Sequence, residues 1–176
     1  MIDLHTGRLL LRPVSAADAA ALHVLFTQPG VRKFIFDDEI LPAERTADII
    51  RTSVESFASN RFGLWLATHE DTAQTIGFGA FWYFREPPEL ELLYGVGDQH
   101  VKQGYGREIA RAIVDYGFGR LKMPEIRAST DAAHVDSQRL LEDLHFTMER
   151  RATVGGLDTV FYARRATIES AAAARG

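Results

Sequence analysis

The spacing of apolar residues near the start of the chain predicts a strand followed by a helix. Residues 8–14 form a short apolar run that Pro13 interrupts, and proline favours an edge strand because it has no N–H to donate. Residues 16–28 carry apolar side chains at helical spacing. Ser15 stands at the N-cap of this helix, and Asp18 follows at the position of an acidic capping-box partner.

A second helix is predicted over 42–60, after Pro29 and Gly30 end the first one. The remaining pattern is a run of three strands, a helix, a strand, a helix and two strands. These strands are predicted over 62–69, 75–84, 90–96, 124–130, 146–154 and 157–166, and these helices begin after Gly104 and span 134–144. Because the order does not repeat βα strictly, it predicts an α/β (α+β) fold with a mixed central sheet of about seven strands and helices on both faces.

Composition limits the class of protein. The 176 residues are expected to form a single domain over 1–176, with residues 166–176 as a tail. A formal net charge of -4 argues against a nucleic-acid partner, since such binders carry basic surfaces. The absence of cysteine excludes disulfides, thiolate nucleophiles and cysteine metal ligands. No apolar run is long enough for a signal peptide or a membrane span, which predicts a cytoplasmic protein without a membrane partner.

The segment QGYG, residues 103–106, lies between a predicted strand and a predicted helix. It is not a P-loop, because no Lys-Ser/Thr pair follows it. It is not a Rossmann motif, because three antiparallel-looking strands precede it. Two interpretations stay open on physical grounds: a simple strand-to-helix connection, and a cradle whose free N–H groups bind a phosphate.

Several segments resemble one known family in a consistent order. KQGYGREIARAIVDYGF, residues 102–118, resembles motif A of the GNAT superfamily of acyl-CoA-dependent N-acyltransferases, and HVDSQRLLEDLHF, residues 134–146, resembles its motif B. RLLLRPVSAADAAALHVLF and ELELLYGV resemble its branch that includes the ribosomal-protein-alanine acetyltransferases. The resemblance implies the GNAT fold, with the strands over 90–96 and 124–130 splayed apart. It also implies acetyl-CoA as cosubstrate, an amine as acceptor and no metal.

The resemblance further implies where the coenzyme lies. Its pyrophosphate is expected at the backbone N–H groups of Gln103, Gly104, Tyr105, Gly106 and Arg107, where the glycines allow close approach and the helix dipole favours an anion. Its pantetheine arm is expected to lie like an added strand along the backbone of Tyr94, Gly95 and Val96. His134 stands at the family's usual asparagine position and is expected to contact the coenzyme, with N-capping of the helix or plain exposure as the alternative.

Two residues are predicted to carry the chemistry. Glu91, with Glu89 in reserve on the same strand face, aligns with an acidic residue of this branch and is expected to accept the amine's proton directly or through water. The leucines beside Glu91 are expected to desolvate its carboxyl group and raise its pKa. Ser137 is expected to hydrogen-bond the departing sulfur, because Leu141 stands where many members have a tyrosine.

The acceptor amine is expected in a cleft between the first two helices and the last hairpin. Its lining is predicted to include Phe34, Phe36, Trp82 and Tyr83, beside the acids Asp37, Asp38 and Glu39. Such a cleft attracts a cationic amine. The alternative that the aromatic residues are core and the acids a solvated loop stays open.

The leading hypothesis for function is therefore an acetyl-CoA-dependent N-acetyltransferase. The alternative is a non-catalytic acyl-CoA binder or sensor, suggested by Leu141 in place of tyrosine and His134 in place of asparagine. A hydrolytic or metal enzyme is disfavoured, because the sequence contains neither HExxH nor G-x-S-x-G. Family habit and exposed aromatic residues suggest a homodimer.

Overall fold

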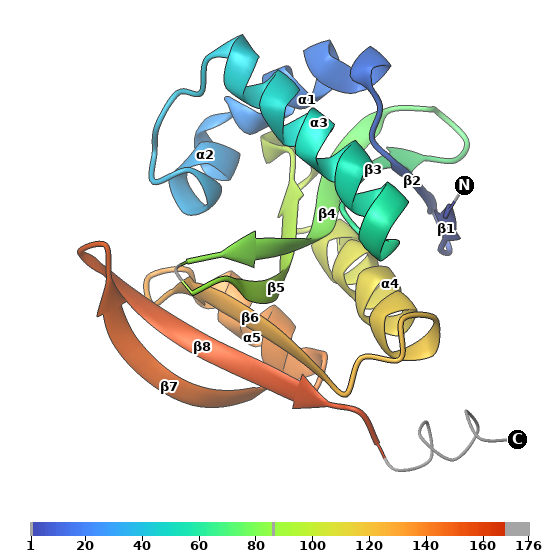
Figure 1. Ribbon diagram of the computed structural model, residues 1–176. Helices are drawn as coiled ribbons and strands as arrows, with labels where there is room; N and C mark the ends of the chain where they lie inside the picture. Colours follow the sequence, from blue (N-terminus) through green and yellow to red (C-terminus); the bar gives the residue numbers. More distant parts are fainter. Residues whose placement is uncertain (1, 86, 168–176) are drawn as a thin grey trace, which may run out of the picture.

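The computed structural model describes residues 2–85 and 87–167, and it shows an eight-stranded sheet covered by helices (Figure 1). The strands are β1 Leu4–His5, β2 Leu9–Pro13, β3 Leu64–His69, β4 Thr75–Phe84, β5 Glu89–Val96, β6 Glu125–Asp131, β7 Thr147–Val154 and β8 Leu157–Arg165. The helices are α1 Ala19–Phe26, α2 Pro29–Ile35, α3 Ala43–Asn60, α4 Tyr105–Gly119 and α5 Val135–Asp143, with 3-10 turns at Ala16–Asp18 and Asp98–His100. The predicted mixed sheet with helices on both faces is confirmed. Residues 168–176, most of the predicted tail, lie outside the described residues.

The sheet runs in the order β1-β2-β3-β4-β5-β6-β8-β7. Every neighbouring pair is antiparallel except β5 and β6, which are parallel. A parallel pair needs a long crossover, and α4 provides it by carrying the chain back along the sheet. The sheet therefore has a single parallel junction near its middle, between β5 and β6.

Two local predictions from the sequence were wrong. The strand with Pro13 is not at the edge, because β1 pairs with Leu10 and Leu11 and becomes the edge itself. Pro13 lies beyond this short pairing, so β1 does not need its missing N–H. Pro29 does not end a helical region but begins α2, since a proline at the first helical position leaves no intrahelical hydrogen bond unmade.

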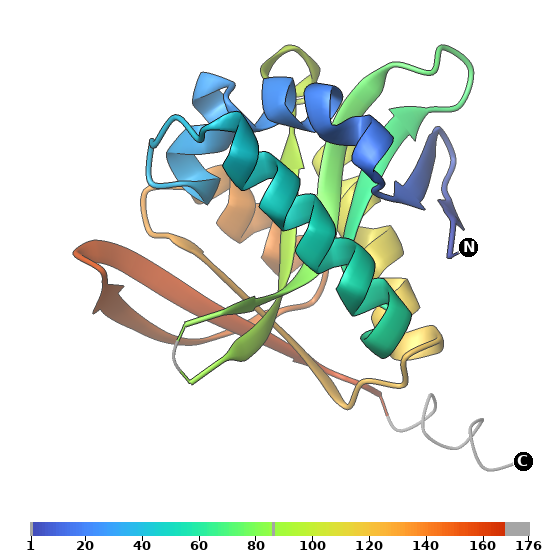
Figure 2. The ribbon, with the colours of Figure 1, turned by 45° about the horizontal axis from the view of Figure 1, so that its top comes forward.

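α4 and α5 cover one face of the sheet, and α1, α2 and α3 cover the other (Figures 1 and 2). On the first face, Ile113 of α4 lies directly beside Gly79 of β4, since a Cβ built on Gly79 would lie 2.2 Å from its Cδ1. On the second face, the ring of Phe78 packs edge-on against Phe26 of α1 with centroids 5.1 Å apart. Because successive residues of a strand point to opposite faces, these contacts fix the face of each side chain on β4 and β5.

The capping box predicted at Ser15 is confirmed, and its buried carboxylate, Asp18, also forms an ion pair with Arg12. The Asp18 carboxylate accepts a hydrogen bond from the backbone N–H of Ser15 at 2.8 Å, and Arg12 Nη1 donates to it at 2.8 Å. Asp18 is only 5% exposed. The hydrogen bonds from Arg12, opposed by burial and helped by Ser15, lower the pKa of Asp18 to about 2.

This lowered pKa predicts an acid-dependent loss of stability. The charged Asp18 stabilises the fold fully above its ordinary pKa of 3.8, and the contribution is lost as the pH falls through about 2. We expect Asp18→Asn to lower the free energy of unfolding by roughly 2 kcal/mol at pH 7 and by much less below pH ~2. Urea unfolding at several pH values measures the difference. Asp158→Asn is the control, because the Arg151–Asp158 pair is exposed and should contribute little at any pH. A wild-type-like pH profile for Asp18→Asn would contradict this account.

Candidate active site

The parallel junction between β5 and β6 is nearly unpaired. The two strands are in register only at Glu91 and Arg127, although β5 has eight residues and β6 has seven. Beyond this point the edge of β5 that carries Tyr94, Gly95 and Val96 pairs with β4 on its other side and not with β6. The open edge can accept an extended chain with amide groups, as the predicted splayed strands require.

Packing in the core explains why residue 95 is a glycine. In register it stands opposite Phe78, and a Cβ built on Gly95 would lie 2.5 Å from the ring of Phe78. The regular register of β4 and β5 at this point shows no bulge. The glycine therefore makes room for an aromatic ring of the core.

The glycine turn before α4 has the geometry of an anion cradle. Gly104 is the N-cap of α4 with φ of 84°, a left-handed conformation that favours glycine. Tyr105, Gly106 and Arg107 follow in the first turn, where backbone N–H groups have no partner within the helix. A Cβ built on Gly104 meets only the Arg8 guanidinium, at 3.5 Å, so the turn is open to solvent. The geometry favours the phosphate cradle over a simple connection.

Arg8, near the start of the chain, contacts this turn through its guanidinium group. Its Nη1 donates to the carbonyl oxygen of Gln103 at 3.2 Å, and its guanidinium lies 4.1 Å from the centroid of the Tyr105 ring. Its Nε donates to Glu108 at 2.8 Å. Burial opposes ionisation of Glu108, but the hydrogen bonds from Thr6 and Arg8 outweigh it and lower the pKa of this carboxyl group. Arg8 thus joins the start of the chain to both ends of this turn.

Two residues predicted to contact the coenzyme have side chains that contact other residues of the protein. Arg107 forms an ion pair with Asp143 of α5, so its backbone N–H rather than its guanidinium faces the turn. His134 is the N-cap of α5, and its ring stacks on Phe34 of α2 with centroids 3.8 Å apart. Burial is the main cause that lowers the pKa of His134, which keeps the imidazole neutral at neutral pH.

Ser137 lies in the first turn of α5 and is only 8% exposed. Its Oγ is 2.8 Å from the hydroxyl of Tyr94, which reaches across from β5 on the face covered by α4 and α5. Burial, partly offset by the hydrogen bond with Ser137, raises the pKa of Tyr94 to about 12. Leu141, one helical turn after Ser137, is fully buried in the core. A tyrosine hydroxyl from β5 therefore lies beside Ser137, although α5 itself carries no tyrosine.

Glu91 occupies the point at which β5 and β6 begin to diverge. It stands opposite Trp82 and points to the face covered by α1, α2 and α3, opposite to Tyr94. Its carboxylate is 3% exposed, forms an ion pair with Arg85 and accepts a hydrogen bond from the hydroxyl of Ser129 at 2.6 Å. The carboxyl group is buried as expected, but Leu90 and Leu92 point to the other face of the sheet and are not the cause. The cationic partner Arg85 was not predicted. Glu89 is paired with Arg85 as well, at 3.1 Å.

The four aromatic residues predicted to line the acceptor cleft do not all meet. Phe34 covers His134, and Trp82 is the register partner of Glu91 on the same sheet face. Phe36 packs edge-on against Phe26 in the core, with centroids 5.0 Å apart. Tyr83 points to the opposite face, where its ring lies 6.0 Å from that of Phe62. Of these residues, Trp82 shares the sheet face of Glu91 and Phe34 stacks on His134, whereas Tyr83 points away from that face.

Two carboxylates, Asp37 and Asp131, lie near each other at the end of β6. Asp131 ends β6, and its pKa is raised by burial and then by the nearby charge of Asp37. Neither carboxylate forms an ion pair with another described residue.

In residues 2–85 and 87–167 there is no group of three histidine or acidic side chains placed to hold a metal. None of the helices in this part of the chain is long and apolar enough to cross a membrane.

The sequence reading missed three contributors to this site. The sequence predicts a role for the backbone of Tyr94 but gives no signal for its side chain, whose partner Ser137 lies 43 positions away. Arg85 lies in the hairpin between β4 and β5, where Phe84 pairs with Glu89, so its closeness to both glutamates follows from the hairpin register. Arg8 could not have been found, because nothing local links it to a turn 96 positions later.

Comparison with known proteins supports the same family as the geometry. The family described as the acetyltransferase (GNAT) domain matches residues 8–147. A relative from Bacillus licheniformis, named uncharacterized N-acetyltransferase p20, is 29% identical over 153 residues, covering 85% of this chain and 84% of that protein. An acetyltransferase from Agrobacterium tumefaciens superposes with a TM-score of 0.81 at 21% identity, over 94% of this chain and 95% of the other.

A second solved structure is the ribosomal L7/L12 alpha-N-protein acetyltransferase RimL in complex with coenzyme A. It superposes with a TM-score of 0.78 at 16% identity, over 93% of this chain and 97% of the other, which shows a shared fold. The family match itself extends from the start of β2 to the start of β7 and includes the cradle, the strand gap and Ser137. The chain therefore belongs to the GNAT family of acetyltransferases.

Proposed function

We propose that this chain transfers the acetyl group of acetyl-CoA to a primary amine by direct attack in a ternary complex. The observation that carries the proposal is the open edge between β5 and β6 beside the N-terminus of α4. When bound, acetyl-CoA supplies an activated acetyl thioester. The residues proposed to hold it are Tyr94, Gly95 and Val96 on β5, Gln103, Gly104, Tyr105, Gly106 and Arg107 in the cradle, and His134 at the N-cap of α5.

In the reaction one bond forms, one bond breaks, and the acceptor loses two protons. A C–N bond forms as the C–S bond breaks, and the ammonium form of the acceptor loses two protons in becoming an amide. One proton ends on the coenzyme thiol, and the other goes to solvent. The chain must therefore stabilise a positive charge on the attacking nitrogen and a negative charge on the departing sulfur.

Glu91 is proposed to act on the nitrogen. Arg85 and Ser129 both stabilise its ionised form, so a negative charge is fixed at the point where the strands diverge. A fixed carboxylate stabilises the charge that develops on the nitrogen as the C–N bond forms, and water then removes the proton. Ser137 lies on the opposite face of the gap, where its hydroxyl can hydrogen-bond the sulfur. The two polar groups thus flank the gap from opposite faces.

The acceptor is proposed to be a cationic primary amine, either a protein N-terminus or a small molecule. Asp37 lies close enough to Asp131 for its charge to raise the pKa of that carboxyl group, and two neighbouring carboxylates attract a cation. Trp82 lies on the same sheet face as Glu91, and Phe34, which stacks on His134 and has Lys33 Nζ 5.2 Å from its ring centroid, is the second aromatic residue proposed to contact the acceptor. The fold neighbour RimL is named for a ribosomal protein N-terminus, which makes such peptides the first acceptors to test.

The test combines binding with turnover. We expect calorimetry to show acetyl-CoA binding, and thiol release to follow with at least one amine from a panel of Ser- and Ala-initiated peptides, amino acids and spermidine. The chain has no cysteine, so every free thiol detected comes from the coenzyme. Failure to bind acetyl-CoA would refute the site. Binding without thiol release from any amine would favour the alternative of a non-catalytic acyl-CoA binder. A cytoplasmic location and a homodimer remain predictions.

A further inference from the structure

A pair of hydroxyl groups joins β5 to α5 beneath the open strand gap. Tyr94 extends from β5 on the face covered by α4 and α5, and its hydroxyl lies 2.8 Å from Ser137 Oγ and 3.4 Å from the Ser137 carbonyl oxygen. We propose that Tyr94 is a positioning residue that donates its hydrogen to Ser137 Oγ, so that the serine hydrogen is aimed at the coenzyme sulfur. This inference rests on the proposed function, since it requires coenzyme A in the gap.

The direction of the hydrogen bond between Tyr94 and Ser137 follows from the relative strengths of their hydroxyl groups as donors. A phenol is a stronger hydrogen-bond donor than an aliphatic alcohol, because its hydroxyl is far more acidic. Donation from Tyr94 uses a lone pair of Ser137 Oγ and leaves the serine hydrogen free to rotate. A hydroxyl that accepts one hydrogen bond donates a stronger one in turn, since the two bonds polarise each other. The pair therefore presents one strengthened donor to the sulfur.

The alternative of a proton relay from Tyr94 is excluded on energetic grounds. Burial is the main cause that raises the pKa of Tyr94 to about 12. An ordinary thiol has a pKa of about 8.5, so moving the proton from this tyrosine to a thiolate is unfavourable by roughly a thousandfold or more. Tyr94 stays neutral throughout, and water protonates the thiolate. The pair stabilises the sulfur anion without giving up a proton.

Neighbouring residues place the hydroxyl pair of Tyr94 and Ser137 beside the proposed coenzyme site. Ser137 is 8% exposed, so water competes little for its hydroxyl in the absence of a ligand. A Cβ built on Gly106 would lie 3.4 Å from Leu140 and 3.5 Å from Val96, which places the cradle, β5 and α5 around one narrow space. The hydroxyl pair belongs to that same space, because Val96 and Tyr94 share a strand face.

The test measures the acidity of bound coenzyme A rather than turnover. Ultraviolet difference absorbance reports thiolate formation as the pH rises, with protein loaded with desulfo-coenzyme A as the blank. The measurement is clean because the chain has no cysteine. In the wild-type protein we expect the thiol pKa to fall by about one unit relative to free coenzyme A, which is a tenfold gain in thiolate. Tyr94→Phe and Ser137→Ala should each abolish most of this shift, and the double variant should lose no more than Ser137→Ala alone.

Tyr162→Phe is the matched control. This buried tyrosine of β8 points to the same sheet face, but its hydroxyl meets Glu142 at 3.4 Å instead of Ser137. The control should keep the full shift. A shift retained in Tyr94→Phe but lost in Ser137→Ala would overturn the inference, as would an unshifted thiol in wild-type protein that binds the coenzyme. Failure of wild-type protein to bind coenzyme A at all would instead refute the proposed function, and the inference with it.

Discussion

Replacing Gly104 with glutamate is expected to weaken acetyl-CoA binding by at least ~100-fold, which corresponds to about 2.7 kcal/mol. The new carboxylate would stand in the cradle formed by the first N–H groups of α4, where an anion is expected to bind. Like charges in this position repel the pyrophosphate, and the side chain also occupies the approach to the backbone. Calorimetric titration with acetyl-CoA measures the change.

Two controls separate charge from backbone strain. Gly104 has a φ of 84°, so any side chain there costs roughly 1–2 kcal/mol of strain. Gly156, in the hairpin between β7 and β8, has nearly the same φ of 87° and open space around it. Gly156→Glu should therefore lose similar stability while keeping full coenzyme affinity. Gly104→Ala should bind more tightly than Gly104→Glu. Equal affinity of Gly104→Glu and wild-type protein would show that the turn is only a strand-to-helix connection.

Replacing Arg85 with leucine is expected to destabilise the fold by about 3–5 kcal/mol, because it leaves a buried carboxylate without its cation. Glu91 is 3% exposed and relies on Arg85 and Ser129 to stabilise its charge. Removing one partner of a buried pair is costly, whereas removing both charges often costs little. The double variant Arg85→Leu, Glu91→Leu should therefore recover most of the lost stability. Urea unfolding of both variants measures the difference.

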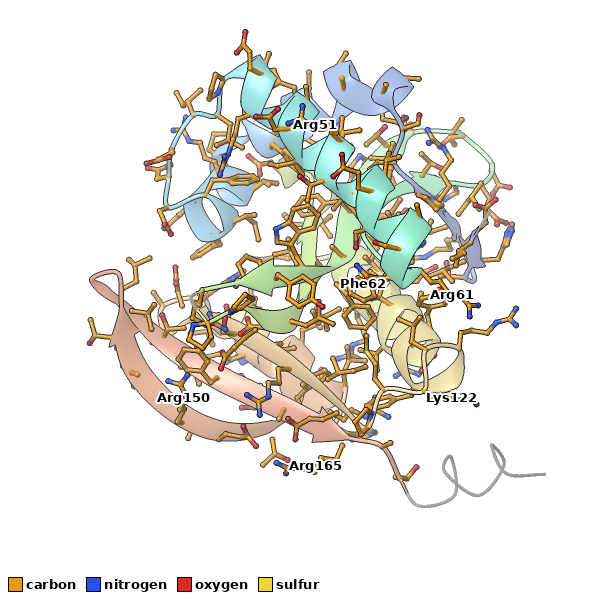
Figure 3. All side chains as sticks on the ribbon, in the orientation of Figure 1. Arg51, Arg61, Phe62, Lys122, Arg150 and Arg165 are labelled. Carbon is orange, nitrogen blue, oxygen red and sulfur yellow. The ribbon has the colours of Figure 1, made fainter. Side chains whose placement is uncertain are left out.

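Arg150 provides the matched control for this prediction. Its guanidinium lies over the same Phe161 ring as that of Arg85, at 3.5 Å from the centroid compared with 5.0 Å, but it is an exposed residue of β7 (Figure 3). Arg150→Leu should cost at most about 1 kcal/mol, which is the usual contribution of an exposed cation–π contact. If Arg85→Leu cost no more than Arg150→Leu, the ion pair with Glu91 would not be a major source of stability.

Much of the site could be predicted from the sequence because its parts are local. The cradle combines a glycine, a helix start and an apolar helical face within a few positions, so the segment itself specifies it. The capping box at Ser15 is local in the same sense. The beginning of α2 was missed because Pro29 and Gly30 are compatible with both the end of one helix and the first turn of another. Only packing chooses between these two outcomes.

The sequence by itself determined the order of elements from α3 to β8, the glycine turn that begins α4, and the strand that carries Glu91 and Tyr94, but it did not show β1 or α2. Alternation along this strand also determined that these two residues, an odd number of positions apart, point to opposite faces. Only the tertiary structure decided what each side chain meets. It placed Arg85 against Glu91, Tyr94 against Ser137 and Arg8 against the cradle. Hydrophobic periodicity encodes which face of an element is buried, whereas partners from distant elements are set by register and packing, which no local pattern records.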